Sequence, residues 1–140
     1  MKVFLDTNIL LDIIEQRTDF VLASSNVFDL GIKGKVDLYV TSLTFANCVY
    51  TARKNVGYAN AINGLKFLKS HLTIATMNND QCERALNSDM PDFEDMLQFE
   101  AAMDSGCDVI ITRDKKRHYP KDQIPIMTPT QFMETFEEST

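Results

Sequence analysis

The sequence predicts an α/β domain in which a central, mainly parallel sheet is covered by helices on both faces. Short apolar runs of strand length alternate along the chain with longer segments whose apolar residues have helical spacing. The chain has 140 residues, 44% of them hydrophobic, which suits one globular domain with a substantial core. We therefore expect residues 1–140 to form a single domain, with any site at the carboxyl ends of the strands.

The first half of the chain begins with the apolar run KVFLD, which has the length of a buried strand. Asp6 or Thr7 can cap the helix that follows, and Ser42 can cap the third helix. Gly34 separates the second helix from the second strand. The predicted elements are, in order, a strand at 2–6, helices at 7–15 and 18–33, a strand at 34–42 and a helix at 42–54.

The second half continues the same alternation. Pro91 suits the start of a helix, and Gly106 suits its end. The run CDVIIT contains the continuous apolar stretch VII, as in a strand that is buried on both faces, and Thr128 with Pro129 can open the last helix. The predicted elements are helices at 57–70, 79–87, 91–104 and 128–137, and strands at 71–77, 107–112 and 124–127.

Composition limits the class of protein. Fourteen basic and twenty acidic residues give a net charge of −6, so any binding of nucleic acid must be local. The three cysteines, Cys48, Cys82 and Cys107, lack metal-binding spacing and suit reduced thiols in a cytoplasmic protein. We expect no signal peptide and no contact with a membrane, because no apolar run is long enough for either.

Two acids end apolar strands: Asp6 after VFL and Asp114 after VIITR. If these strands are neighbours, both carboxylates enter one crevice, where like charges repel unless a cation lies between them. Each acid also has an ordinary interpretation, because Asp6 can cap a helix and Asp114 can stabilise a turn.

A third acid is expected near the start of the helix at 91–104, which offers Asp92, Glu94 and Asp95. Acids there can simply complement the helix dipole or cap the helix. Asp95, however, shares a face with Phe99 and Ala102, and that face is expected to point inward. We therefore take Asp95 as the third ligand, with Glu94 or Asp92 as a further, outer ligand.

Carboxylates without histidine or cysteine partners favour Mg²⁺ or Mn²⁺ over zinc. Such a site suits activation of water and stabilisation of charge on a phosphodiester. A basic cluster beside Asp114 could hold phosphates, although each of its side chains could equally be a solvated loop residue. Its members are Arg113, Lys115, Lys116, Arg117 and Lys121.

The motifs LDTNILLD, DFEDMLQFEAA and DVIITRD, in this order, resemble the PIN domain. The resemblance is to the small bacterial PIN proteins that include VapC-like toxins, and it covers nearly the whole chain. It implies a three-layer α/β/α fold and a metal-dependent ribonuclease site formed by Asp6, Asp95 and Asp114. Within the resemblance, Asn8 and Thr112 would hold these carboxylates by hydrogen bonds. A toxin would further imply a homodimer and a small antitoxin that blocks the site.

The chain departs from the family at Asn47, where the family often has a glutamate. A neutral amide is a poorer metal ligand than a carboxylate, so a PIN-like scaffold that binds RNA or protein without cutting is the alternative function. Other α/β classes fit less well. The stretch Asp6-Thr7-Asn8 lacks the second acid of haloacid-type phosphotransferases and of receiver domains, and no glycine-rich phosphate loop is present.

Overall fold

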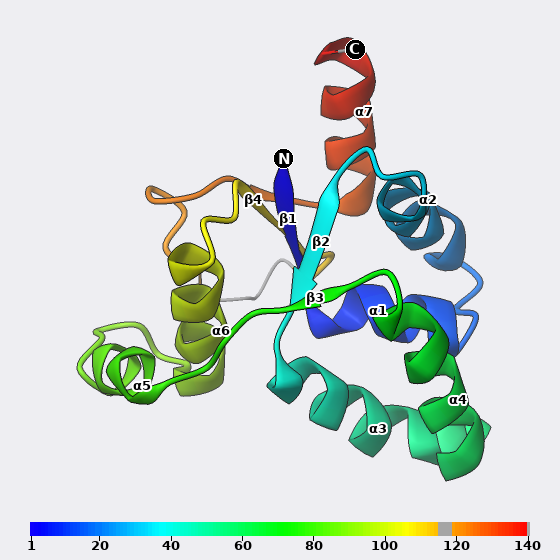
Figure 1. Ribbon diagram of the computed structural model, residues 1–140, viewed down its shortest axis with the longest axis horizontal. Helices are drawn as coiled ribbons and strands as arrows, with labels where there is room; N and C mark the ends of the chain where they lie inside the picture. The colour runs from blue at the N-terminus through cyan, green and yellow to red at the C-terminus, as the bar shows by residue number, and fades with distance from the viewer. Residues whose placement is uncertain (115–118, 140) are drawn as a thin grey trace.

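A computed structural model describes residues 1–114 and 119–139 (Figure 1). The strands are β1 (Lys2–Leu5), β2 (Asp37–Val40), β3 (Thr73–Ile74), β4 (Val109–Ile111) and β5 (Ile126–Met127). The helices are α1 (Thr7–Ile14), α2 (Val21–Ile32), α3 (Ser42–Val56), α4 (Tyr58–Lys69), α5 (Asn79–Leu86), α6 (Phe93–Asp104) and α7 (Pro129–Ser139). None of these helices is both long and apolar enough to cross a membrane.

The five strands form one sheet in the order β3-β2-β1-β4-β5, and every neighbouring pair is parallel. Successive side chains of a strand point to opposite faces of the sheet, so the strands contribute to two hydrophobic cores. Val3 and Leu5 pack with apolar residues of α1–α4 and α7, whereas Phe4 and Ile110 pack with residues of α5 and α6. Figure 1 shows these two groups of helices on opposite sides of the strands. The predicted three-layer α/β/α fold is confirmed.

The sheet order brings the two acid-terminated strands together. β1 and β4 are central neighbours, with Leu5 paired to Ile111. The ladder extends one residue further, because the backbone N–H of Asp6 donates to the carbonyl of Ile111 at 3.0 Å. The carboxyl ends of both strands therefore open at the same edge of the sheet.

Several element boundaries differ from the sequence prediction. α3 is capped by Thr41, not Ser42, through a reciprocal capping box with Thr44. α6 begins after Asp92 rather than at Pro91, because the side chain of Asp92 accepts a hydrogen bond from the backbone N–H of Asp95. α2 begins at Val21, three residues later than predicted, and β3 covers only Thr73–Ile74 of the predicted third strand.

All three cysteines are free, and two of them are buried. Burial, reinforced for Cys48 by the negative charge of Asp6, raises the pKa of the Cys48 and Cys107 thiols to about 12. Both thiols therefore stay protonated, and the thiolate is the reactive form. At pH 8 we expect the thiol reagent DTNB to modify only Cys82 rapidly in the native protein and all three cysteines in denaturant. Rapid modification of all three cysteines in the native protein would contradict this packing.

Candidate active site

The carboxylate of Asp6 is buried at the junction of β1 and α1, with 1% of the residue exposed. Its Oδ1 accepts a hydrogen bond from the backbone N–H of Thr7 at 2.7 Å, so Asp6 does cap α1. Its Oδ2 accepts from the hydroxyl of Thr112 at 2.7 Å and, more weakly, from Nδ2 of Asn8 at 3.4 Å. Asp6 thus combines the ordinary capping role with contacts to both residues that the family resemblance assigns to it.

Thr112 connects the ends of β1 and β4. Its hydroxyl donates to Asp6 and accepts from the backbone N–H of Asp114 at 3.2 Å and from Nδ2 of Asn8 at 3.2 Å. One buried hydroxyl therefore contacts the Asp6 carboxylate and the backbone of Asp114. Asp114 itself is exposed. These contacts fix where the chain leaves β4, and they place Asp114 beside Asp6 at the sheet edge.

The three acids of α6 have different environments. Asp92 caps the helix. Asp95 is 1% exposed and lies on the same buried face as Phe99 and Ala102, as the helical spacing predicted. Glu94 is half-buried and faces a cavity. Of the two acids considered as an outer ligand, Glu94 is therefore better placed than Asp92.

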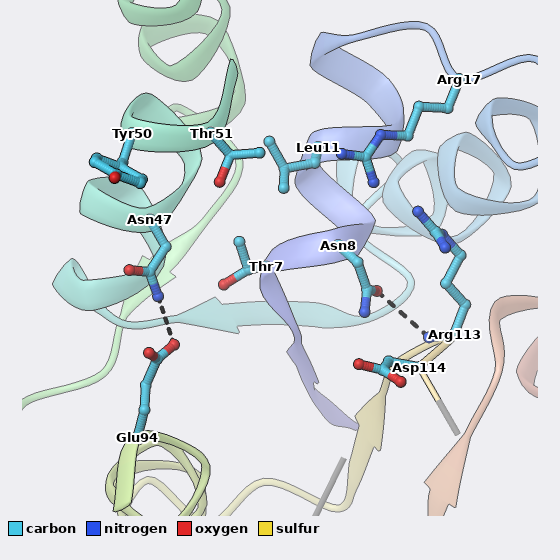
Figure 2. Close-up of a pocket in the computed structure, with 10 residues that line it drawn as sticks. All are labelled: Thr7, Asn8, Leu11, Arg17, Asn47, Tyr50, Thr51, Glu94, Arg113 and Asp114. Carbon is cyan, nitrogen blue, oxygen red and sulfur yellow. Dashed lines mark hydrogen bonds between the residues drawn. The ribbon is translucent and has the colours of Figure 1, made fainter. Parts of the chain in front are cut away.

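That cavity, of about 460 Å³, lies between α1, α3, α6 and the turn after β4 (Figure 2). Figure 2 shows Glu94 reaching toward Asn47 of α3, while Asp114 lies on the other side, beyond Thr7 and Asn8. The buried Asp6 and Asp95 adjoin Thr7 and Glu94 in the chain. The cavity is lined by Thr7, Asn8, Leu11, Arg17, Asn47, Tyr50, Thr51, Glu94, Arg113 and Asp114.

Helix α6 is held against α3 by buried hydrogen bonds. The hydroxyls of Thr41 and Thr44 donate to Oε1 of Gln98 at 2.9 and 3.3 Å. One turn before Gln98, Nδ2 of Asn47 donates to Oε1 of Glu94 at 2.7 Å. The residue that departs from the family pattern therefore positions an acid from another helix instead of supplying one.

In the metal-dependent ribonuclease that the family resemblance implies, replacing Asn47 with alanine should lower the rate of RNA cleavage roughly tenfold to a hundredfold, the usual effect of removing a group that orients a metal ligand. The hydrogen bond to Glu94 is lost, while α3 keeps its cap. Asn60→Ala is the control, because Asn60 is exposed and its side chain donates to the carbonyl of Val56 in its own part of the chain, away from Glu94. Equal rates for the two variants would show that the orientation of Glu94 does not matter.

Arg113, predicted to contact RNA, has a protein partner. Its Nε and Nη2 contact both carboxylate oxygens of Asp12 at 2.8 to 3.0 Å, and its guanidinium lies 3.9 Å from the ring centre of Phe20. Asp12 is fully buried and also accepts from the hydroxyl of Ser24 at 2.7 Å. A charged residue inside the apolar run LLDII was a signal for such a pair. Lys115, Lys116 and Arg117 lie outside the described residues.

Five cavity residues were not identified as site residues from the sequence: Thr7, Leu11, Arg17, Tyr50 and Thr51. Arg17 ends beside the cavity, where it pairs with Glu15 at 2.7 Å and lies 3.6 Å from Asp12. The Oγ1 of Thr7 is buried and makes no hydrogen bond to any described residue. Nothing in the local sequence pattern distinguishes Arg17 or Thr7 from ordinary residues at a helix end.

In the described part of the chain, the acids do not form a preformed metal site. Within residues 1–114 and 119–139, no group of three or more histidine, cysteine, aspartate or glutamate side chains is arranged to hold a metal ion. The donors are nevertheless hard oxygen ligands, as Mg²⁺ and Mn²⁺ prefer, and Thr7, whose hydroxyl is buried, lines the same cavity as Glu94 and Asp114. The chemistry of the donor set fits such an ion, and the side chains would have to converge on it.

Comparison with known families decides where this fold and site belong. The family model of the PIN domain matches residues 2–116, which is most of the chain. The chain belongs to the PIN domain family. Asp6 and Asp114 both lie in the matched part of this PIN domain, as do Asn47 and the acids of α6.

Individual relatives of this PIN domain agree with that assignment. The chain is 28% identical over 138 residues to Ribonuclease VapC1 of Aquifex aeolicus. The alignment covers 95% of this chain and 94% of the relative. Two solved structures share the fold. VapBC2 from Rickettsia felis, bound to a promoter DNA fragment, has a TM-score of 0.63 at 18% identity, covering 91% of this chain and 97% of that one. VapC20 of Mycobacterium tuberculosis, described as a toxin that cleaves the sarcin-ricin loop, has a TM-score of 0.66 at 12% identity, covering 81% and 91%.

Proposed function

We propose that this PIN domain protein is an endoribonuclease that hydrolyses RNA phosphodiester bonds with the help of Mg²⁺ or Mn²⁺. One observation carries the proposal: at adjacent strand ends, the hydroxyl of Thr112 donates to the carboxylate of Asp6 and accepts from the backbone N–H of Asp114, and Asp114 lines a cavity together with Glu94. A binding module has little use for acids at such a point, because they repel phosphate unless a cation lies between them.

Asp6, Asp95 and Asp114 would hold the cation, with Glu94 as an outer ligand. A divalent ion there would activate water and neutralise charge that develops on the phosphate. Thr112 and Asn8 supply the hydrogen bonds that orient Asp6. Asp95 rests on the buried face of α6, so its backbone is fixed by the packing of Phe99 and Ala102.

Cationic groups of the cavity support a phosphate ligand. The side chains of Arg17 and Arg113 are 29% and 23% exposed, so neither is fully enclosed by the protein carboxylate that it pairs with. Both residues line the same cavity as Glu94 and Asp114. A phosphate there would face arginine on one side and the metal-binding acids on the other, which is how a site of net negative charge can hold an anion.

Cleavage of a mixed set of RNA oligonucleotides in Mn²⁺, Mg²⁺ or EDTA tests the proposal, with wild type compared to Asp114→Asn. We expect cleavage only with a divalent ion and none by the variant, which loses charge with little change in volume. Cleavage in EDTA, or full activity of Asp114→Asn, would contradict it. If wild type neither cleaves RNA nor melts at a higher temperature with Mn²⁺, the non-cleaving scaffold, which Asn47 favours, becomes the function.

A toxin role in the cytoplasm, with a small antitoxin and a homodimer, is proposed from similarity to VapC1 and VapBC2 alone. The antitoxin would be encoded by a short neighbouring reading frame. We expect its product to co-purify with this chain and to suppress cleavage. A nuclease that is harmless on expression and unaffected by any neighbouring product would be a housekeeping enzyme instead.

A further inference from the structure

A second cavity, of about 310 Å³, lies on the other side of Asp114, at the carboxyl ends of β4 and β5. Asp114 lines both this cavity and the one beside Glu94, so the two cavities adjoin at this acid. Thr112, whose hydroxyl bonds to Asp6, also lines the second cavity. A polymer bound with one phosphate at Asp114 must leave the site in two directions, and the second cavity is open to one of them.

The walls of the second cavity combine three kinds of group. Lys121 is exposed and supplies a positive charge. Ile126 and Met127 are half-buried and form an apolar surface. Thr128 and Gln131 supply polar groups at the start of α7. A charge for phosphate, an apolar surface for a base and polar groups for base or ribose edges are the contacts that proteins make to single-stranded RNA.

The polar groups are held in place. The backbone N–H of Thr128 donates to Oε1 of Gln131 at 2.9 Å, and the backbone N–H of Gln131 donates to the hydroxyl of Thr128 at 3.1 Å. This pairing uses the carbonyl oxygen of the Gln131 amide and leaves its Nε2 to donate to a ligand. The first turn of α7 has no acidic residue to oppose a phosphate.

We propose that the second cavity binds the nucleotide of the RNA substrate next to the phosphate at Asp114, with Lys121 contacting a phosphate and Gln131 a base or ribose edge. The proposal rests on the proposed ribonuclease function. It adds a binding site to the acids, and it extends the substrate contact from the α1–α3 side of the sheet to the β5–α7 edge.

The test is binding of a labelled single-stranded RNA to Asp95→Asn protein, a background in which the RNA stays intact, followed by fluorescence anisotropy. Adding Lys121→Ala should weaken binding about fivefold to tenfold and lower the salt dependence by about one phosphate contact. Adding Gln131→Ala should weaken binding about threefold with the salt dependence unchanged. Lys35→Ala is the charge-matched control, because Lys35 is exposed before β2, at the opposite end of the strands.

The proposal would be refuted if both cavity variants bound RNA as tightly as the Lys35→Ala control. It would also be refuted if the protein did not bind RNA at all. The outcome is separate from that of the cleavage assay. If the protein cleaves RNA with a metal ion but Lys121→Ala and Gln131→Ala do not change binding, the second cavity is not an RNA-binding site and the ribonuclease proposal stands. If RNA binding depends on Lys121 and Gln131 but the protein does not cleave RNA, the second cavity is an RNA-binding site and the ribonuclease proposal fails.

Discussion

Replacing Asp95 with asparagine should lower the rate of RNA cleavage about a thousandfold, because loss of this proposed metal ligand would remove several kcal/mol of charge stabilisation. The fold should remain, since asparagine has nearly the same volume and Asp95 is held by the packing of α6. The measurement is single-turnover cleavage at saturating Mn²⁺, with the melting temperature of each protein recorded beside it.

Asp92→Asn is the matched control, three residues away at the same helix end. Asparagine caps a helix as well as aspartate does, so the bond to the N–H of Asp95 persists. We expect cleavage within about threefold of wild type, because a cap acts on the helix and not on the metal. Equal losses in both variants would mean that general negative charge at the start of α6 matters, rather than a ligand at Asp95.

Replacing Asp12 with alanine should lower the free energy of unfolding by about 3 kcal/mol, the lower end of the cost of removing one partner of a buried ion pair, because Asp12 is fully buried but Arg113 is 23% exposed. Arg113 would lose both of its contacts to the carboxylate, and Ser24 would lose an acceptor. This is a large part of the stability of an ordinary domain, which is about 5 to 15 kcal/mol. The pair also joins α1 to the residue before Asp114, so cleavage should fall as well.

Asp29→Ala is the control for this pair, because Asp29 and Lys33 form an ion pair on the surface of α2, with side chains 47% and 58% exposed. Such pairs are worth less than about 1 kcal/mol. Urea unfolding of both variants measures the difference. A loss below about 1 kcal/mol for Asp12→Ala would show that Arg113 finds solvent or another partner at little cost.

The fold was largely predictable because local pattern and global packing agree. Strand-length apolar runs and helical spacing gave the element order, and the face shared by Asp95 and Phe99 gave the inward side of α6. Boundaries were less predictable, because a cap is chosen by side-chain geometry. Thr41 forms a capping box with Thr44, so Thr41 rather than Ser42 is the N-cap of α3. The side chain of Asp92 accepts from the N–H of Asp95, so α6 begins after Asp92 rather than at Pro91.

The site was predictable only where its residues follow strand and helix ends. Asp6 and Asp114 stand out because a carboxylate interrupts an apolar run, and parallel strands bring such ends together. A local pattern can indicate that a residue needs a partner, as Asp12 does inside LLDII, but it does not identify the partner across the fold. The contact of Asn47 with Glu94 depends on how α3 packs against α6, and the partner of Arg113 depends on where α1 lies. The second cavity depends on the pairing of β5 with β4.

The direct test of the metal site is a crystal structure of the protein with Mn²⁺, with the ion located by anomalous scattering. We expect an anomalous peak among the carboxylates of Asp6, Asp95 and Asp114, and no such peak in crystals of Asp95→Asn. Crystals that hold no Mn²⁺ there, or that hold it only at surface acids such as Glu100 and Asp104, would contradict a metal-dependent active site at the ends of β1 and β4.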